Sequence, residues 1–479
     1  MRQRATWLSA TEVELFTDAA LALLEQVGLR IAGSECLGAL AAAGAVVDAE
    51  RAVVRFPEEV ARSALATLPR SFTLGAAVDE LDVTLTEGAA SRFCPGGCAA
   101  FVLDDETGVR RPSTLADLRT ATAALDELPE LDVMWTQVAA TDLPPEGRAM
   151  AELGTALLES RKHVVLVESP GPADDLAGLA EILAADLSRF AARPRFSTLL
   201  TVASPLQIDG RLLDVHVRAA AFGAPVFVYS VTMAGATAPV TVAGAVAQTI
   251  AEVAGAAVAV ALLAPGAKVV LGPSPTTLDM QTGQACYASP EAAVMTAACA
   301  ELVHHLGMPV ICSGMATEAK HLGVQAGLEK ALKTLAVAAT GADLLSGGIG
   351  LIDTANTLYL PQIPVDGEIA ARVRRMTGPF EVSPVTLLSD RVAAVGIGGD
   401  FLGERETRKR IRAGEHQRPV VSDRQAYEVW RAGGLTETDL ARARVRDLLD
   451  AHERRAPWTD ARVAAAVRRV CGLDVAGAA

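Results

Sequence analysis

Short apolar runs alternate with longer segments of helical periodicity over residues 115–400. Brief apolar runs are typical of buried parallel strands, and apolar positions repeating every three to four residues are typical of helices. The predicted strands are residues 132–138, 163–168, 196–201, 226–229, 268–272, 310–312, 343–346 and 357–362. The predicted helices lie near residues 146–160, 173–189, 209–222, 239–263, 289–306, 323–340 and 366–375. This alternation predicts an α/β fold, a (β/α)8 TIM barrel, with a doubly wound sheet as the alternative.

Two attachments flank the predicted barrel. Residues 1–114 predict a helical cap, whose first helix follows the capping signal at Ser9 and Glu12, and then a β-hairpin over residues 92–113. Residues 401–479 predict a helical extension that begins with a basic run. The expected organisation is therefore an N-terminal attachment (1–114), the barrel (115–400) and a C-terminal helical tail (401–479).

Composition narrows the possible functions. The 479 residues are 51% hydrophobic but only 4% aromatic, which favours packed helices and parallel strands. A net charge of −14 argues against nucleic acid, because binding phosphates needs a basic surface. Seven cysteines without a CxxC pair predict a reduced cytoplasmic chain without a metal site. No signal-like segment begins the chain, and the alanine-rich helices carry charges too often to predict a membrane span.

Polar residues collect just after the predicted strands, where barrel enzymes carry their chemistry. They form no GxSxG, Walker or GxGxxG motif, and no Ser/His/Asp order. Lys320, in a loop after a strand, is a candidate for a Schiff base, whereas Lys268 begins a strand and should be structural. Asp279 and Glu318 are either paired carboxylates of a binding site or N-caps of the helices that follow.

Five segments resemble the trimethylamine methyltransferase family: DDETGVRRPSTLADL (104–118), SPLQIDG (204–210), AGATAPVT (234–241), LDMQTG (278–283) and QAGLEK (325–330). The resemblance implies a barrel with helical attachments that passes a methyl group from a methylamine to the cobalt of a separate corrinoid protein. No pyrrolysine is present, which points to the branch that uses quaternary amines such as glycine betaine. The chain departs from the family pattern at Asp400, where His is expected, and at Gly323, where Asp is expected.

The resemblance predicts transfer from a quaternary or tertiary amine to a corrinoid (cobamide) presented by a partner protein, with no tightly bound cofactor. The amine leaves as a neutral molecule and needs no proton. The protein is therefore expected mainly to bind and orient the substrate cation, with aromatic faces and carboxylates. The expected substrate-binding residues are Glu168, Tyr229, Asp279, Met280, Thr282, Tyr287, Thr317, Glu318 and Lys320. The expected corrinoid-facing positions are Gly314, Gly347 and Gly348, and the catalytic residues stay unassigned.

Three hypotheses for the function remain open: a methyltransferase, a lyase or aldolase that uses Lys320, and a non-catalytic protein that binds quaternary ammonium ions. A homo-oligomer is expected for a barrel with large helical attachments.

Overall fold

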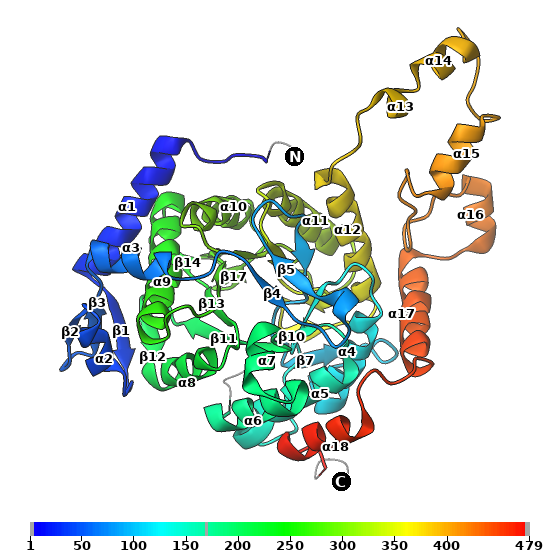
Figure 1. The fold of residues 1–479 in the computed structure, drawn as a ribbon. Helices are drawn as coiled ribbons and strands as arrows, with labels where there is room; N and C mark the ends of the chain where they lie inside the picture. The colour runs from blue at the N-terminus through cyan, green and yellow to red at the C-terminus, as the bar shows by residue number, and fades with distance from the viewer. Residues whose placement is uncertain (1–3, 168–170, 475–479) are drawn as a thin grey trace.

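Eight short parallel strands form the centre of the molecule. The structure, a computed structural model, describes residues 4–167 and 171–474 (Figure 1). The eight strands are β6 (Arg92–Phe93), β9 (Val133–Trp135), β10 (His163–Leu166), β11 (Phe196–Val202), β13 (Val226–Ser230), β15 (Val269–Pro273), β18 (Ile311–Ser313) and β19 (Leu344–Ser346). Seven of them lie where the apolar runs predict a strand.

The strands form a curled five-stranded parallel sheet, in the order β15-β13-β11-β10-β9, and a three-stranded sheet, β18-β19-β6. Leu271 and Val310 form a parallel bridge between β15 and the segment that leads into β18. At the other edge, the backbone N–H of Asp132, just before β9, donates to the carbonyl of Phe93 in β6 at 2.8 Å. The two sheets are thus linked at both edges.

The prediction for the eighth strand was wrong. Residues 357–362 do not join the parallel sheets: β21 (Thr357–Leu358) belongs to a separate four-stranded sheet, in the order β20-β21-β7-β8. The strand that pairs with β19 is β6, which lies inside the predicted hairpin segment 92–113. The hairpin itself is shorter and consists of β7 (Phe101–Leu103) and β8 (Arg110–Pro112). A two-residue strand followed by Pro95 gives too short an apolar run to be recognised.

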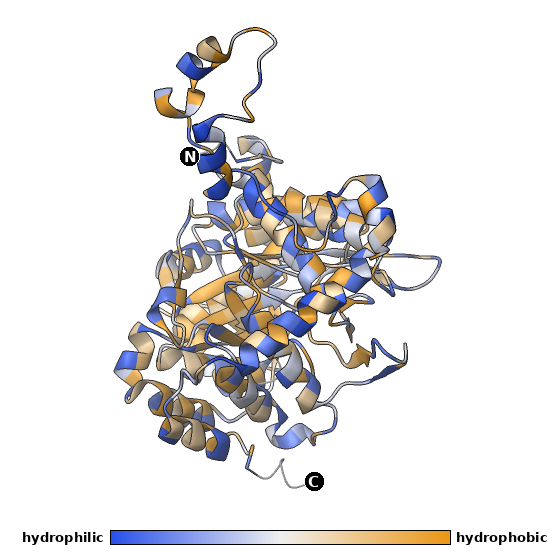
Figure 2. Cartoon of the chain, turned by 90° about the vertical axis from the view of Figure 1, so that its right-hand side faces the viewer, coloured by the Kyte–Doolittle hydropathy of each residue, from blue (hydrophilic) through white to orange (hydrophobic). Residues whose placement is uncertain are grey.

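A helix follows each of the parallel strands along the chain. The eight are α4 (Leu115–Asp126), α5 (Pro145–Glu159), α6 (Ala173–Ala184), α8 (Gly210–Ala221), α9 (Val242–Leu263), α10 (Pro290–His305), α11 (Val324–Ala339) and α12 (Gln362–Thr377). All but α4 confirm the seven predicted helices, and α7 (Leu187–Ala192) adds a short helix after α6. Seen from the side in Figure 2, apolar strands lie inside a shell of helices with polar outer faces.

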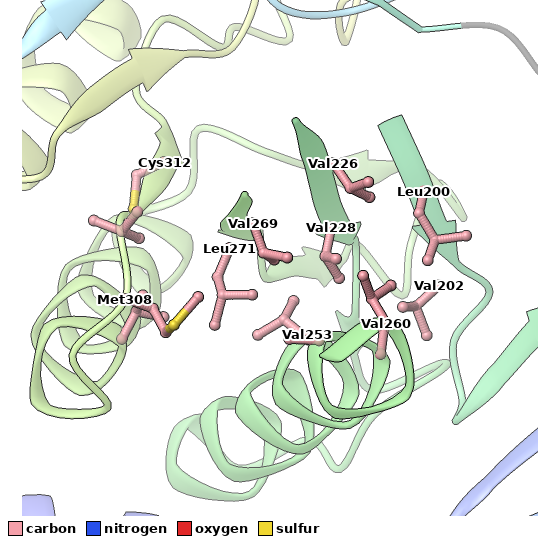
Figure 3. Close-up of a cluster of buried hydrophobic side chains, with 14 of the residues drawn as sticks. Leu200, Val202, Val226, Val228, Val253, Val260, Val269, Leu271, Met308 and Cys312 are labelled. Atoms are coloured by element: carbon pink, nitrogen blue, oxygen red, sulfur yellow. The ribbon is translucent and has the colours of Figure 1, made fainter. Parts of the chain in front are cut away.

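Helix α9 is the exception to this amphipathic pattern. Its 22 residues include one charged side chain, Glu252, so the prediction that charges interrupt every alanine-rich helix was wrong for α9. It is the one described helix that is long and apolar enough to cross a membrane, yet 83% of its most apolar 18-residue stretch is buried in the protein. Figure 3 shows Val253 and Val260 of α9 facing Val228 of β13 and other strand side chains. Such packing is that of a core helix.

The N-terminal attachment closes one end of the strands. It contains α1 (Ala10–Gln26), β1 (Leu29–Ala32), α2 (Leu37–Ala42), β2 (Val46–Asp48), β3 (Val53–Arg55), α3 (Glu58–Ala66), β4 (Phe72–Leu74) and β5 (Val83–Leu85). The capping box of Ser9 and Glu12 is present, as predicted. Side chains of β4 and β5 pack against the inner side chains of the parallel strands. The ring of His163 at the start of β10 lies 3.2 Å from the Gly75 carbonyl, so this hairpin covers the amino ends.

The C-terminal region is helical, and its first helices, α13 and α14, have no buried residues. It comprises α13 (Pro384–Leu387), α14 (Ser389–Val395), α15 (Arg405–Arg412), α16 (Tyr427–Gly433), α17 (Glu437–Glu453) and α18 (Ala461–Val470). One anchor is Glu368 of α12, whose carboxylate accepts the N–H groups of Val420, Val421 and Ser422. Burial alone would raise the pKa of Glu368, but hydrogen bonds from Ser422, Val421 and Arg372 outweigh it and lower the pKa to about 2. In Figure 1, α13 and α14 project away from the body.

Candidate active site at the carboxyl ends of the strands

The inner side chains of the parallel strands form a layer of large apolar groups, because alternate strand residues point to the same face. Trp135 of β9 and Tyr229 of β13 end this layer on the carboxyl side. Their rings meet edge to face with centroids 6.3 Å apart, and Trp135 meets Phe227 at the same distance. Two aromatic rings in this geometry form an apolar, electron-rich wall at the strand ends.

Tyr229 reaches across the barrel-like sheet. Its hydroxyl lies 3.4 Å from that of Ser346 on β19. The ring lies over Gly272 of β15, where an added Cβ would come within 2.2 Å of a ring carbon. Glycine at this position is therefore what allows the tyrosine to lie flat. Burial raises the pKa of Tyr229 to about 12, so its hydroxyl stays protonated at physiological pH.

Two buried polar atoms near this wall have no hydrogen-bond partner within the described chain: Nε1 of Trp135 and Oε1 of Gln137. The amide nitrogen of Gln137 donates to the carbonyl of Ile349 at 3.3 Å, which fixes its side chain beside the loop after β19. A buried polar atom left unpaired costs about 1–3 kcal/mol, so native proteins rarely keep one without a use. These atoms are suited to contact a ligand.

The glycine loop that follows β19 is built into the neighbouring strand ends. Gly347 and Gly348 have φ of 118° and 116°, and a Cβ on Gly347 would meet the hydroxyl of Ser313 at 2.8 Å. The N–H of Gly314 donates to the carbonyl of Ser346 at 2.7 Å. The N–H of Gly348 donates to the carbonyl of Pro95 at 2.6 Å. The three glycines assigned from sequence thus lie in one tightly packed loop region at the carboxyl ends.

Lys330 and Asp366 support this loop from below. The Lys330 ammonium lies 2.6 Å from the Asp366 carboxylate and donates to the Gly348 carbonyl at 2.8 Å. Asp366 also accepts the N–H of Gly350 at 2.7 Å. Both side chains are fully buried, and burial lowers the pKa of Lys330 and raises that of Asp366.

Tyr287 and Glu318, both predicted from sequence, are brought together. The Glu318 carboxylate accepts the N–H of Ala288 at 3.0 Å, next to Tyr287. Burial raises the pKa of Glu318. Lys333 of α11 donates to the Tyr287 carbonyl at 2.6 Å, and burial lowers the pKa of Lys333 to about 8. Sequence reasoning missed Lys333, because a lysine in a helix normally indicates an exposed position; its only signal is a place on the same face as Lys330.

Thr317 and Lys320 lie in the loop after β18 but differ in environment. The Thr317 hydroxyl is buried and donates to Glu329 at 2.5 Å. The side chain of Lys320 is 64% exposed and pairs with Asp353 at 2.8 Å. A Schiff-base lysine needs desolvation or a neighbouring cation to lose its proton. The surroundings of Lys320 provide neither, so nothing here favours the lyase.

Asp279, Met280 and Thr282 form an exposed turn. It joins β16 (Thr276–Leu278) to β17 (Ala285–Cys286), and Met280 is 79% exposed. Asp279 accepts the N–H of Gln281 and the hydroxyl of Thr282, and these hydrogen bonds lower its pKa. Neither Asp279 nor Glu318 caps the next helix, because Ser289 and Gly323 occupy those positions. Glu168 lies outside the described residues.

Several residues of the five family-like segments fasten loops to the core. Ser204 donates to the buried carboxylate of Glu252 at 2.6 Å, and the N–H of Leu206 donates to it at 3.0 Å. Arg111 makes a two-point contact with Asp117, at 2.7 Å for each hydrogen bond. The segments that signal the family are thus partly fold determinants.

Asp126, Glu127 and His452 are the one group of possible metal ligands among the residues that the structure describes. Arg161 pairs with Asp126 at 2.7 Å, and Arg455 pairs with Glu127. Because these cations already balance the carboxylates, the group is better suited to hold α17 against the body than to bind a cation.

Helices surrounding parallel strands, with aromatic and polar groups gathered at the carboxyl ends, define an α/β enzyme of the kind that binds a small ligand there. Residues 2–470 match the family model of trimethylamine methyltransferase (MTTB), so the chain belongs to that family. It is a methyltransferase that depends on a corrinoid protein, and the family implies an amine as substrate.

Known relatives extend over nearly the whole chain. Trimethylamine methyltransferase MttB of Methanosarcina thermophila is 30% identical over 93% of this chain and 95% of its own. The glycine betaine methyltransferase of Desulfitobacterium hafniense is 27% identical, covering 92% of each chain. The crystal structure of the Methanosarcina barkeri monomethylamine methyltransferase matches with a TM-score of 0.50 at 13% identity, covering 94% of this chain and 93% of that one. This last likeness concerns the fold.

Proposed function

We propose that this chain transfers a methyl group from a quaternary amine of the glycine betaine class to the cobalt of a corrinoid protein, as a member of the branch without pyrrolysine. We further infer that its two parallel sheets form one closed (β/α)8 barrel, since both edges are linked and a helix follows each strand. The cytoplasm is the proposed location, because none of the cysteines in the described residues forms a disulfide.

The observation that carries the proposal is the aromatic wall of Trp135 and Tyr229 at the strand ends. A tetraalkylammonium ion has no N–H to donate, so hydrogen-bond acceptors cannot recognise it in the usual way. Aromatic faces attract such a cation by about 0.5–2 kcal/mol each. The partly buried carboxylate of Glu318, in the loop after β18 and beside Tyr287, would supply the negative charge that balances the ammonium.

The cobalt supplies the nucleophile that accepts the methyl group, and the amine departs with the electron pair of the broken C–N bond. No proton moves in this step, so this chain needs no general acid or base. Its residues have to strip water from the cation and hold one methyl group toward the opening. The sparse set of titratable groups near Trp135 and Tyr229 suits that task.

The other residues take supporting roles in the proposal. Thr317 and Tyr287 would line the substrate site next to Glu318, and the turn with Asp279, Met280 and Thr282 would cover it. The exposed Lys320, which pairs with Asp353 in the free protein, would have to exchange that partner to bind a substrate carboxylate. Gly314, Gly347 and Gly348 would face the corrinoid, because they follow β18 and β19 at the carboxyl ends of the strands.

A substrate panel tests the proposal. The protein is incubated with a reduced corrinoid protein and, in turn, glycine betaine, other betaines and trimethylamine. Methyl-cobalt absorption with at least one quaternary amine is expected. Binding by calorimetry without methylation would favour the non-catalytic ammonium-binding protein, and borohydride trapping of a substrate on Lys320 would favour the lyase.

A further inference from the structure

Helix α11 carries apolar side chains on its exposed face and two lysines among the residues of its buried face. Val324, Leu328 and Leu332 follow one another at intervals of four, on one face, and all three are exposed, Val324 to 90%. Lys330 and Lys333 of the same helix are fully buried. A surface helix normally shows the opposite arrangement, with apolar residues inward and charges outward. The outer face of α11 is therefore built like a surface that another molecule covers.

A second uncovered apolar surface lies on the arm formed by residues 379–402, which contains α13 and α14. Neither helix has a buried residue. In Figure 1 the arm leaves the end of α12 and projects away from the body, and in Figure 2 apolar patches alternate with polar ones along it. Its exposed apolar side chains include Val382, Val385, Leu387, Val392, Ile397 (109%) and Leu402 (85%).

The helices of the arm are too short to be stable without a surface that covers them. Helices of four and seven residues are far below the length at which an isolated helix persists in water, about 12–15 residues. Monomeric proteins rarely leave apolar groups so densely exposed over a continuous segment. The arm is therefore expected to pack on something.

We propose that the occupant is a second copy of this chain: the arm of each copy lies on the outer face of α11 in the other. One chain supplies both surfaces, so a two-fold arrangement satisfies both at once. The arm starts at the end of α12, and α12 packs along α11. The two surfaces therefore lie close together on one copy, so that each copy could place its arm on α11 of the other.

The available area agrees with a dimer interface. Burying an aliphatic side chain removes about 60–120 Å² from water. Scaled by their exposed fractions, the six arm residues and three α11 residues named above would bury roughly 400–800 Å² per copy, against about 800 Å² per partner in a standard interface.

Light scattering of the full chain after size exclusion, over a wide range of concentration, tests the proposal. The wild type is expected at twice its 49.7 kDa mass or a higher even multiple. The double variant Ile397→Asp with Leu402→Asp, and the double variant Leu328→Asp with Leu332→Asp, should each weaken dimerisation by about 100-fold or more. Circular dichroism should stay unchanged, because none of these side chains is buried within one copy.

The matched control is Leu15→Asp, an exposed leucine on α1 far from the arm, which should keep the wild-type mass. A wild type that stays at 49.7 kDa, or arm variants that keep the oligomer, would overturn the proposal. Oligomers that survive the α11 variants alone would overturn the assignment of α11 as the receiving surface. A wild type that gains mass only when a corrinoid protein is added would assign the arm to that partner instead.

Discussion

The ammonium of Lys330 lies 2.6 Å from the carboxylate of Asp366, and both side chains are completely buried. The pair joins α11 to α12 underneath the glycine loop that follows β19. A buried ion pair adds little net stability, because desolvation of the two charges offsets their attraction. Its value is geometric: it fixes the carbonyl of Gly348 and the N–H of Gly350, and so the loop proposed to face the corrinoid.

Removal of one partner should therefore cost far more than removal of both charges. Lys330→Met leaves a buried carboxylate without its cation, which typically costs about 3–5 kcal/mol. Lys330→Met combined with Asp366→Asn should recover much of that loss, because the neutral amide can still accept the N–H of Gly350. Urea unfolding of the two variants and the wild type measures both effects. A single variant as stable as the wild type would contradict the buried pair.

The parallel core could be predicted from the sequence because its strands are short apolar runs separated by helical periodicity. Seven strands and all eight helices except α4 were expected from that pattern. The eighth strand could not be predicted, because Arg92 and Phe93 form a run of only two residues. They pair with β19, which lies about 250 residues later in the chain, and no local pattern signals that pairing. Nor does periodicity reveal that α9 is a core helix rather than an amphipathic one.

The candidate site was only partly predictable for a related reason. Residues that follow strands, such as Tyr229 and Glu318, could be selected because parallel strands present their carboxyl ends together. What each then contacts depends on loops whose course the sequence does not specify, so Asp279 closes its own turn while Glu318 holds the backbone next to Tyr287. The buried position of Lys333 could not be foreseen, because a lysine in a helix normally indicates an exposed position.

Trp135 should contribute to substrate affinity more than to the rate of transfer. Trp135→Leu removes one aromatic face from the proposed cation site, which should raise KM for the amine by about 5–30-fold. The matched control is Trp7→Leu, which alters an exposed tryptophan of the N-terminal segment and should leave KM unchanged. Steady-state methylation of the corrinoid protein gives both constants. Equal KM values for the two variants would argue against an aromatic site at Trp135.

Attachment of α17 and α18 should weaken as pH rises. The hydrogen bond to Glu159 raises the pKa of His452 above its usual value, and the charges of Glu159, Asp126 and Glu127 add to this while burial opposes it. A raised pKa in the folded state means that the protonated ring stabilises the fold. That stability is fully present below about pH 6.5, the unfolded value, and is lost as pH rises through the folded pKa.

Limited proteolysis of the C-terminal segment between mildly acidic and alkaline pH measures this effect. Cleavage before α17 should become faster as pH rises in the wild type, and His452→Gln should remove most of the pH dependence. The control is His305→Gln, at the far end of α10. A wild type whose cleavage rate does not change with pH would contradict the role assigned to His452.

The central claim is that this protein transfers a methyl group from a quaternary amine to cobalt at the carboxyl ends of its parallel strands. The most direct measurement follows glycine betaine and dimethylglycine by mass spectrometry while methyl-cobalt is followed by absorbance, with the corrinoid protein in its reduced state. The account predicts that dimethylglycine and methyl-cobalt appear in equal amounts and only when this protein is present. Binding of the betaines and trimethylamine without any loss of a methyl group, by protein shown to be folded, would contradict it.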